Sequence, residues 1–493
     1  MLARKTAIQE KVWSIANALR DEGVGKSDYI EQITFLLFLK LADEYSKTPY
    51  DRDIGVPEYC SWETLKYKSG ADLIDNYEFI LEKLSNETGL LKEIFAGAQN
   101  KINTPVQLSK IISVIDGEKW SSMSSDVKGD IYEYMLEKTA GDVKSGAGQY
   151  FTPRPLINAI IKCVRPSPLK TVADPACGTA GFLLGAHSFI ENNYDLNVNE
   201  RTFLKYNTFR GWEIVPNASR MGLMNLLLHN ISDFEKSSPI IRADALLSDP
   251  GERFDYVLTN PPFGNKSSMT ITNDKGVLEG KNIIYQRQDF WTTTNNKQLN
   301  FIQHIHTILK TGGTAAVIVP DNILFESGPG EIVRRNLLQS TNLHTILRLP
   351  KHLFYATTVN ANVIFFENRP ASPFPQTNII WIYDYRSDVK ITLKQNPFLE
   401  SNLDEFVTLY NPSNINNRVP TYSNDNPNGR WRSFTYEEII SRRNIDLDIF
   451  WIKDNNNNDD DMNIHKDIEE YKENIKKLFN LIELLEDAMR HIK

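Results

Sequence analysis

Apolar residues recur at helical spacing through the first part of the chain. Steps of three and four residues separate Ile8, Val12, Ile15 and Leu19, and residues 30–41 are almost continuously apolar. Such spacing is typical of helices that bury one face. We therefore predict an N-terminal helical bundle over residues 1–140.

From about residue 141 the pattern changes to short apolar runs that alternate with helical stretches. The runs that predict strands lie at residues 209–214, 240–246, 254–259, 314–319, 343–349 and 362–366. Strands alternating with helices predict a mostly parallel sheet with helices on both faces. We expect this α/β domain to occupy residues 141–425.

Residues 426–493 form the remaining part, a linker followed by a helical tail. Asparagine and aspartate dominate residues 455–461. A heptad stripe follows, at Ile468, Tyr471, Ile475, Leu478, Ile482, Leu485 and Met489. A stripe of this kind needs a partner helix. We expect either docking to another subunit or packing against the chain's own N-terminal bundle.

The tetrapeptide Asn260-Pro261-Pro262-Phe263 directly follows the predicted strand at 254–259. Two prolines fix φ and supply no N–H, so the loop is stiff. The Asn260 side-chain oxygen and the Pro261 carbonyl can accept the hydrogens of a planar amine while its ring stacks on Phe263. The exocyclic amine of a nucleobase fits this description. The alternative is a Pro-Pro turn that only ends a strand.

Upstream, residues 171–184 have the pattern of a strand, a tight turn and a helix. Asp174 stands where a dinucleotide-binding turn has its first glycine, and Gly178 and Gly181 frame the turn, with Thr179 and Ala180 between them. A carboxylate here favours a ligand with a cationic amino acid end over a pyrophosphate. The pattern predicts S-adenosylmethionine as the cofactor.

Two further carboxylates follow predicted strands. Glu213 is placed to take the hydroxyls of a ribose, and Asp244 to reach an adenine amine. A single acidic residue at a strand end is usually solvated. The ordered set of Asp174, Glu213, Asp244 and Asn260 therefore carries more weight than any one member.

A loop rich in glycine, proline and aromatic residues precedes the glycine turn. It contains Gln149, Tyr150, Phe151, Thr152 and Pro153. We predict Thr152 as the N-cap and Pro153 as the first residue of the next helix. Phe151 is expected to cover the methionine end of the cofactor. An interdomain linker with a capped helix is the alternative.

At these motifs the chain resembles amino-methyltransferases that act on DNA adenine, and more narrowly the modification subunits of type I restriction-modification systems. The resemblance covers nearly the whole chain. It departs at Cys177, often alanine, and at Ala180, often glycine. Its marks are residues 148–153, 174–182, 225–229, 260–264, 319–322 and 347–350, with Leu19-Arg20 and residues 35–39 near the N-terminus.

The resemblance implies a Rossmann-like, S-adenosylmethionine-dependent methyltransferase domain that methylates N6 of an adenine flipped out of DNA. Asn260, Pro261, Pro262 and Phe263 would be its catalytic residues. It also implies a DNA-specificity subunit, with two modification subunits for each, and a restriction subunit. Other functions remain open: a stand-alone adenine methyltransferase, an RNA or protein amide methyltransferase, and a cofactor-binding assembly scaffold.

Bulk properties agree with such an enzyme. A chain of 493 residues with 41% hydrophobic content can form about three domains. A net charge of −8 argues against DNA binding through a large basic surface. Either a partner or basic residues clustered in a cleft would then contact the phosphates. Cys60, Cys163 and Cys177 match neither a disulfide framework nor a metal site. We expect a cytoplasmic protein with no metal and no membrane segment.

Residues 265–297 are polar and lack a clear period. A long segment beside residues 260–263, the acceptor loop, predicts a mobile loop that orders on DNA. Its basic residues, Lys266, Lys275, Lys281 and Arg287, could reach phosphates, or the loop could simply be solvated.

Overall fold

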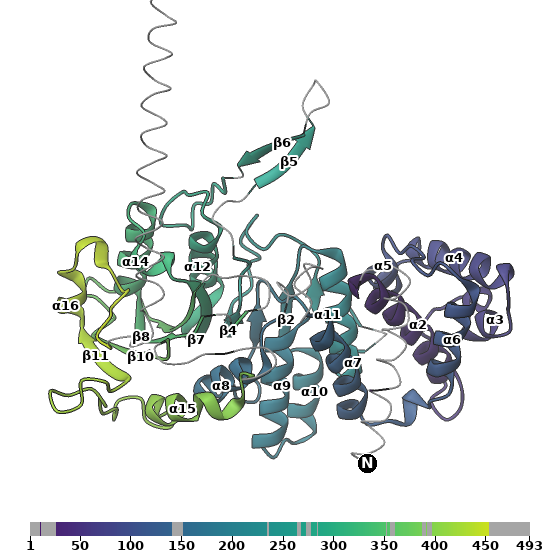
Figure 1. The fold of residues 1–493 in the computed structure, drawn as a ribbon, viewed down its shortest axis with the longest axis horizontal. Helices are drawn as coiled ribbons and strands as arrows, with labels where there is room; N and C mark the ends of the chain where they lie inside the picture. The colour runs from purple at the N-terminus through teal and green to yellow at the C-terminus, as the bar shows by residue number, and fades with distance from the viewer. Residues whose placement is uncertain are drawn as a thin grey trace, which may run out of the picture.

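The structure is a computed structural model (Figure 1). It describes residue 10 and residues 26–140, 151–233, 236–263, 268–272, 278–282, 284–351, 353–354, 360–386, 391 and 397–452. The first predicted helix, the residues Gln149 and Tyr150 and the heptad stripe of the tail lie outside the described residues.

The N-terminal part is helical, as the apolar spacing predicted. Its α-helices are α2 (Lys26–Ser46), α3 (Trp62–Lys66), α4 (Ala71–Ser85), α5 (Gly89–Phe95), α6 (Pro105–Asp116) and α7 (Ser125–Ala140). Helix α6 begins where Thr104 accepts a hydrogen bond from the Gln107 amide and Pro105 fills the first helical position. Helix α2 is buried along its middle, from Ile30 to Ala42. It therefore forms the centre of this part.

The second part is built on a nine-stranded sheet, with the order β11-β10-β8-β9-β7-β4-β1-β2-β3. The pairings between neighbours in the series β7-β4-β1-β2-β3 are all parallel, and β8 also pairs with β10 in parallel. Strand β9 runs antiparallel to both neighbours, and β11 to β10. The strands are β1 (Val172–Asp174), β2 (Phe209–Trp212), β3 (Ile240–Ile241), β4 (Phe254–Thr259), β7 (Leu309–Pro320), β8 (Thr341–Arg348), β9 (Ala361–Asn368), β10 (Ile379–Asp384) and β11 (Trp431–Thr435).

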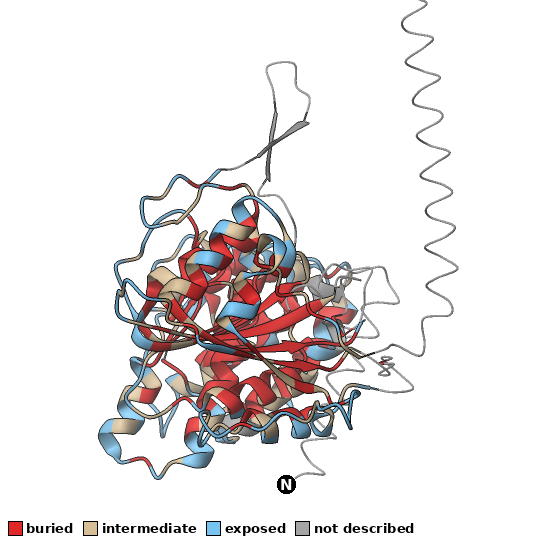
Figure 2. Cartoon of the chain, turned by 90° about the vertical axis from the view of Figure 1, so that its left-hand side faces the viewer, coloured by how far each residue is buried: buried red, intermediate tan, exposed pale blue. Residues whose placement is uncertain are grey.

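Helices cover both faces of this sheet, and the strands between them are buried (Figure 2). One face carries α8 (Arg154–Val164), α9 (Gly181–Asn193), α11 (Pro216–Leu228) and α15 (Asp404–Tyr410), with α10 (Val198–Tyr206) beside them. The other carries α12 (Lys297–Ile308), α13 (Asn322–Phe325), α14 (Pro329–Ser340) and α16 (Tyr436–Ile440). The predicted α/β class with a mostly parallel sheet is confirmed.

Helix α11 joins the two parts. It packs on the sheet side against β3 and on the other side against α2, α5 and α7. One continuous apolar cluster therefore includes side chains of α2 and of α11.

Two segments differ from the sequence expectation. The chain returns to the sheet as β11 after residue 425, because β11 pairs with β10, so the boundary set at 425 falls between two paired strands. The segment expected to be a loop contains an antiparallel pair, β5 (Ser268–Thr272) with β6 (Leu278–Asn282). The prediction failed there because two strands paired only with each other need no buried apolar face.

Helices among the described residues are too short or too polar to span a bilayer.

Candidate active site

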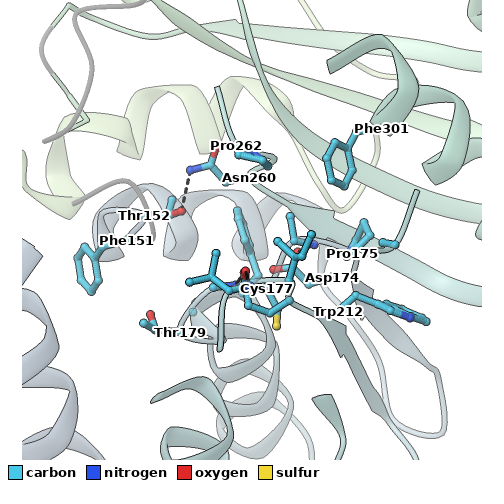
Figure 3. Close-up of a pocket in the computed structure, with 18 of the residues that line it drawn as sticks. Phe151, Thr152, Asp174, Pro175, Cys177, Thr179, Trp212, Asn260, Pro262 and Phe301 are labelled. Atoms are coloured by element: carbon cyan, nitrogen blue, oxygen red, sulfur yellow. Dashed lines mark hydrogen bonds between the residues drawn. The ribbon is translucent and has the colours of Figure 1, made fainter. Parts of the chain in front are cut away.

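A pocket of about 250 Å³ opens at the carboxyl ends of β1, β2, β3 and β4 (Figure 3). Each of these strands delivers a polar side chain to it: Asp174, Glu213, Asp244 and Asn260. Because parallel strands end at the same edge of a sheet, residues far apart in the sequence meet here. Of the predicted residues, Phe151, Thr152, Gly178, Thr179, Gly181 and Pro262 also line the pocket.

The turn between β1 and α9 depends on small residues. Gly178 has φ of +51° and Ala180 has φ of +67°, both in the left-handed region. Glycine adopts this conformation freely, whereas alanine adopts it at a cost, so Ala180 is the strained position of the turn. Helix α11 passes so close that a Cβ at Gly222 would lie 2.7 Å from the Gly178 carbonyl oxygen. The turn therefore packs directly on the α11 backbone.

Asp174 is buried at the end of β1. Its Oδ1 accepts hydrogen bonds from the Thr259 hydroxyl at 2.6 Å and from the Ala176 amide at 3.0 Å. Burial raises the pKa of Asp174 from 3.8 to about 7, and the nearby Glu213 acts in the same direction. Burial thus makes this carboxyl group costly to ionise in the free protein.

Glu213 ties the glycine turn to the start of α11. One carboxylate oxygen accepts from the Gly178 amide at 3.0 Å, and the other from the Val215 amide at 2.8 Å. Burial raises the pKa of Glu213 as well. In the described part of the chain, no Lys or Arg forms an ion pair with Asp174 or Glu213. Two buried carboxyl groups without a cation suit a positively charged ligand.

Asp244 follows β3 and is half-buried. Its carboxylate accepts from the Leu246 amide at 3.0 Å and from the Tyr285 hydroxyl at 2.7 Å. Both bonds orient the side chain at the pocket wall beside Ala243 and Ala245.

Asn260 is held by a residue from the other side of the pocket. Its Nδ2 donates to the Thr152 hydroxyl at 3.0 Å (Figure 3). The prediction that Thr152 caps α8 is wrong: Pro153 is the N-cap residue, and no side chain caps this helix. The Asn260 Oδ1 is buried and has no hydrogen-bond partner among the described residues. It is an acceptor fixed in place beside the pocket.

The prolines after Asn260 are restrained from outside the loop. The Pro262 carbonyl accepts a hydrogen bond from Gln298 Nε2 on α12, which the sequence did not predict. Phe263 is half-buried and packs edge-on against Phe354, with 5.6 Å between the ring centroids. Pro153, Ala180, Pro261 and Phe263 do not line the pocket itself.

Sequence reasoning missed part of the pocket wall. Trp212, Ile214 and Val215 flank Glu213, so the strand end itself could have indicated them. Lys297 and Phe301 come from α12, which carries no motif. Their spacing of four residues on one helix is the signal available in the sequence.

The mostly parallel sheet carries a glycine turn after β1 and an amide-bearing loop after β4 at the same edge. This is the arrangement expected of a Rossmann-like methyltransferase that uses S-adenosylmethionine and methylates an amino group.

Comparisons with known proteins narrow this class. The sequence profile of N-6 DNA methylases matches residues 123–460, and that of the HsdM N-terminal domain matches residues 8–115. The StySJI type I restriction enzyme methylase subunit of Salmonella typhimurium is 38% identical over 92% of this chain and 89% of its own length. The EcoKI methylase subunit of Escherichia coli K12 is 36% identical over the same shares.

A solved structure agrees with these relatives. It comes from work on complex assembly and conformational transition of the type I restriction-modification system. It has a TM-score of 0.74 and 25% identity, and the match covers 98% of each chain.

The chain therefore belongs to the N-6 DNA methylase family, as a type I restriction enzyme methylase subunit. Such a subunit is a DNA adenine methyltransferase that depends on S-adenosylmethionine. The family resemblance stated from the sequence is thereby confirmed.

Proposed function

We propose that the pocket holds S-adenosylmethionine and that Asn260 and Pro261 present the target adenine to it. The observation that carries this proposal is the buried Asn260 Oδ1, which lacks a partner among the described residues. A buried acceptor without a donor costs free energy unless a ligand supplies one. The N6 amine of an adenine is such a donor.

The cofactor fits the residues of the pocket. Asp174 and Glu213 are buried carboxyl groups that form no ion pair with a Lys or Arg among the described residues, and the cofactor carries an ammonium and a sulfonium. The glycine turn from Gly178 to Gly181 would hold its methionine end, with Gln149, Tyr150, Phe151, Thr152 and Pro153 as a cover. Glu213 would accept from its ribose and Asp244 from its adenine amine. When bound, the cofactor supplies an electrophilic methyl group.

The residues of the acceptor loop hold and orient the target base. Asn260 Oδ1 and the Pro261 carbonyl would accept hydrogen bonds from the two N6 hydrogens, so that the nitrogen lone pair is free to form the new bond to the methyl group. One of the two N6 hydrogens would then leave as a proton. Phe263 stacks on the ring of the base after it leaves the duplex, and Pro262 keeps the loop stiff. Thr152 keeps the Asn260 amide from turning.

Replacement of Asn260 by alanine tests this assignment. Asn260→Ala should abolish methylation of DNA, while cofactor affinity measured by calorimetry stays near that of the wild type. Methylation at a near wild-type rate would contradict the roles given to the acceptor loop.

We also propose a division of labour along the chain and with partners. Residues 1–140 form the N-terminal helical domain, residues 141–425 with β11 form the methyltransferase domain, and the tail within 426–493 docks on a DNA-specificity subunit. Type I methylase relatives support a complex with DNA and with specificity and restriction subunits. Two copies of this chain would serve one specificity subunit. Native mass spectrometry of the co-purified complex measures that ratio.

A further inference from the structure

Helix α12 begins next to the acceptor loop, and one of its side chains reaches that loop. Gln298, in the first turn, is 1% exposed and donates from Nε2 to the Pro262 carbonyl. One turn further along the same helix, Phe301 lines the pocket together with Pro262 (Figure 3). The first turn of α12 thus lies beside the acceptor loop and the pocket.

The other buried amides of α12 point elsewhere. Asn300 Nδ2 donates to the Thr294 carbonyl at 3.0 Å, and Gln303 Oε1 accepts from the Thr292 amide at 2.9 Å. Both fix α12 to the segment that leads into it. Of the α12 amide side chains that the structure describes, Gln298 is the one bonded to the acceptor loop.

The acceptor loop has little means of restraining itself. Pro261 and Pro262 have no N–H, so two of the four residues of the loop can be held by hydrogen bonds only through their carbonyls. Thr152 holds Asn260 at one end of the loop, and Gln298 holds the Pro262 carbonyl two residues later. One bond restrains the Asn260 side chain, and the other restrains the peptide plane that follows Pro262.

We propose that Gln298 is a positioning residue for methyl transfer. By fixing the Pro262 carbonyl, it holds the peptide plane between Pro262 and Phe263, and the ring-fixed φ of Pro262 carries part of this restraint back to the Pro261 carbonyl. The Pro261 carbonyl and Asn260 Oδ1 are thereby kept at one separation and one angle, as acceptance of two hydrogens from a single nitrogen requires. This inference rests on the function proposed above for the acceptor loop, which Asn260→Ala tests separately.

Two matched pairs of variants test the inference, with the enzyme assembled in its complex. Gln298→Met and Gln303→Met remove buried amides of equal size from one helix, and both glutamines are 1% exposed. Because small displacements at a reacting centre cost about a hundredfold in rate, Gln298→Met should lower kcat by about that factor. Its KM for the cofactor should change by about twofold or less. Gln303→Met should keep kcat within a few-fold of the wild type.

The second pair is Gln298→Glu and Gln303→Glu, assayed across a range of pH. An ionised glutamate cannot donate to the Pro262 carbonyl, whereas a protonated one can. The kcat of Gln298→Glu relative to the wild type should therefore rise as the pH falls. Gln303→Glu keeps its acceptor for the Thr292 amide and loses a donation of 3.4 Å to Asn300, which does not touch the acceptor loop, so its kcat ratio should change much less with pH.

Equal kcat values for the two methionine variants would overturn the proposal. A kcat ratio of Gln298→Glu to the wild type that does not change with pH would also overturn it. If both Gln298 variants lose their thermal transition and cofactor binding while the Gln303 variants keep them, Gln298 serves folding and the positioning role is wrong. A fully active Asn260→Ala would instead remove the function on which the proposal rests.

Discussion

The hydroxyl of Thr152 accepts a hydrogen bond of 3.0 Å from the amide of Asn260, a residue 108 positions away in the chain. Thr152→Val keeps the shape of the side chain and removes this acceptor. The Asn260 amide can then rotate, so we expect kcat to fall by about tenfold or more while cofactor affinity changes little. Single-turnover methylation of DNA measures the effect.

Thr152→Ser is the matched control, because serine restores the hydroxyl. It should recover most of the rate lost in Thr152→Val. If both variants are equally slow, the methyl group of Thr152 matters and the hydrogen bond does not.

The raised pKa of Asp174 predicts how cofactor affinity depends on pH. In the free protein this pKa is about 7, and a cationic ligand favours the ionised carboxylate. Affinity should therefore be highest above pH 7 and fall as the group becomes protonated. Between about pH 7.5 and pH 6 the dissociation constant should rise roughly five- to tenfold. Calorimetry across this range measures it.

Asp174→Asn is the control for this pH dependence, and it also affects stability. A folded-state pKa above the ordinary 3.8 means that the folded protein binds more protons than the unfolded chain. The Asp174 contribution to stability is thus present at low pH and lost as the pH rises through about 7. Without cofactor, Asp174→Asn should raise Tm above pH 7 and bind the cofactor weakly at every pH. A Tm equal to that of the wild type at pH 8 would argue against the raised pKa.

The close approach of α11 to the glycine turn predicts the effect of a single methyl group. In Gly222→Ala the new Cβ would meet the Gly178 carbonyl at 2.7 Å, so the turn or the helix must move. Overpacking of this kind costs about 1–3 kcal/mol, and we expect cofactor affinity to fall about tenfold. Isothermal calorimetry with the cofactor is the measurement.

Gly185→Ala provides the comparison. Its Cβ would lie 2.7 Å from Cγ2 of Ile157 on α8, so any shift falls on the contact between α8 and α9 and not on the Gly178 carbonyl. Cofactor affinity should stay close to that of the wild type. A similar loss in both variants would show that helix packing in general, and not the turn, sets the affinity.

Arg220 connects the N-terminal helical part to the sheet-containing part, so its replacement should lower the free energy of unfolding. This α11 residue is 3% exposed, and it pairs with Glu31 on α2 and donates to the carbonyls of Ile94 and Ala96 at the end of α5. Arg220→Met leaves a buried carboxylate and two carbonyls without a donor. We expect a loss of roughly 3–5 kcal/mol in the free energy of unfolding, measured with denaturant.

The exposed ion pair of Arg253 with Asp249 is the control against which the loss of unfolding free energy in Arg220→Met is compared. Arg253→Ala should cost about 1 kcal/mol or less. Adding Glu31→Gln to Arg220→Met should recover part of the stability, since it removes the unpaired charge. No recovery would mean that the arginine acts through its carbonyl contacts alone.

Local patterns in the sequence predicted the central strands well. Strand β4 has the bounds expected from its apolar run, and the acidic residues that follow the strands meet at one pocket. Strand period and strand-end chemistry are local properties, so they can be recognised without knowing what packs against them.

Features set by distant contacts were not predictable in this way. An apolar run reveals neither the antiparallel direction of β9 nor the return of the chain as β11, since both depend on the choice of neighbour. Thr152 has the local signature of a helix cap, but a tertiary hydrogen bond to Asn260 uses its hydroxyl instead. Gln298 follows Pro262 by 36 residues and carries no motif, so only the folded chain brings the two together.

The rigidity of the acceptor loop is borrowed from its surroundings. Two prolines stiffen the tetrapeptide, yet its orientation depends on residues outside it. Gln298 on α12 donates to its Pro262 carbonyl, and Thr152, before α8, accepts from its Asn260 side chain. Grafting the four residues alone onto another scaffold would therefore transfer the acceptor groups without the contacts that orient them. An engineer would have to carry over the donor at 298 and the acceptor at 152 as well.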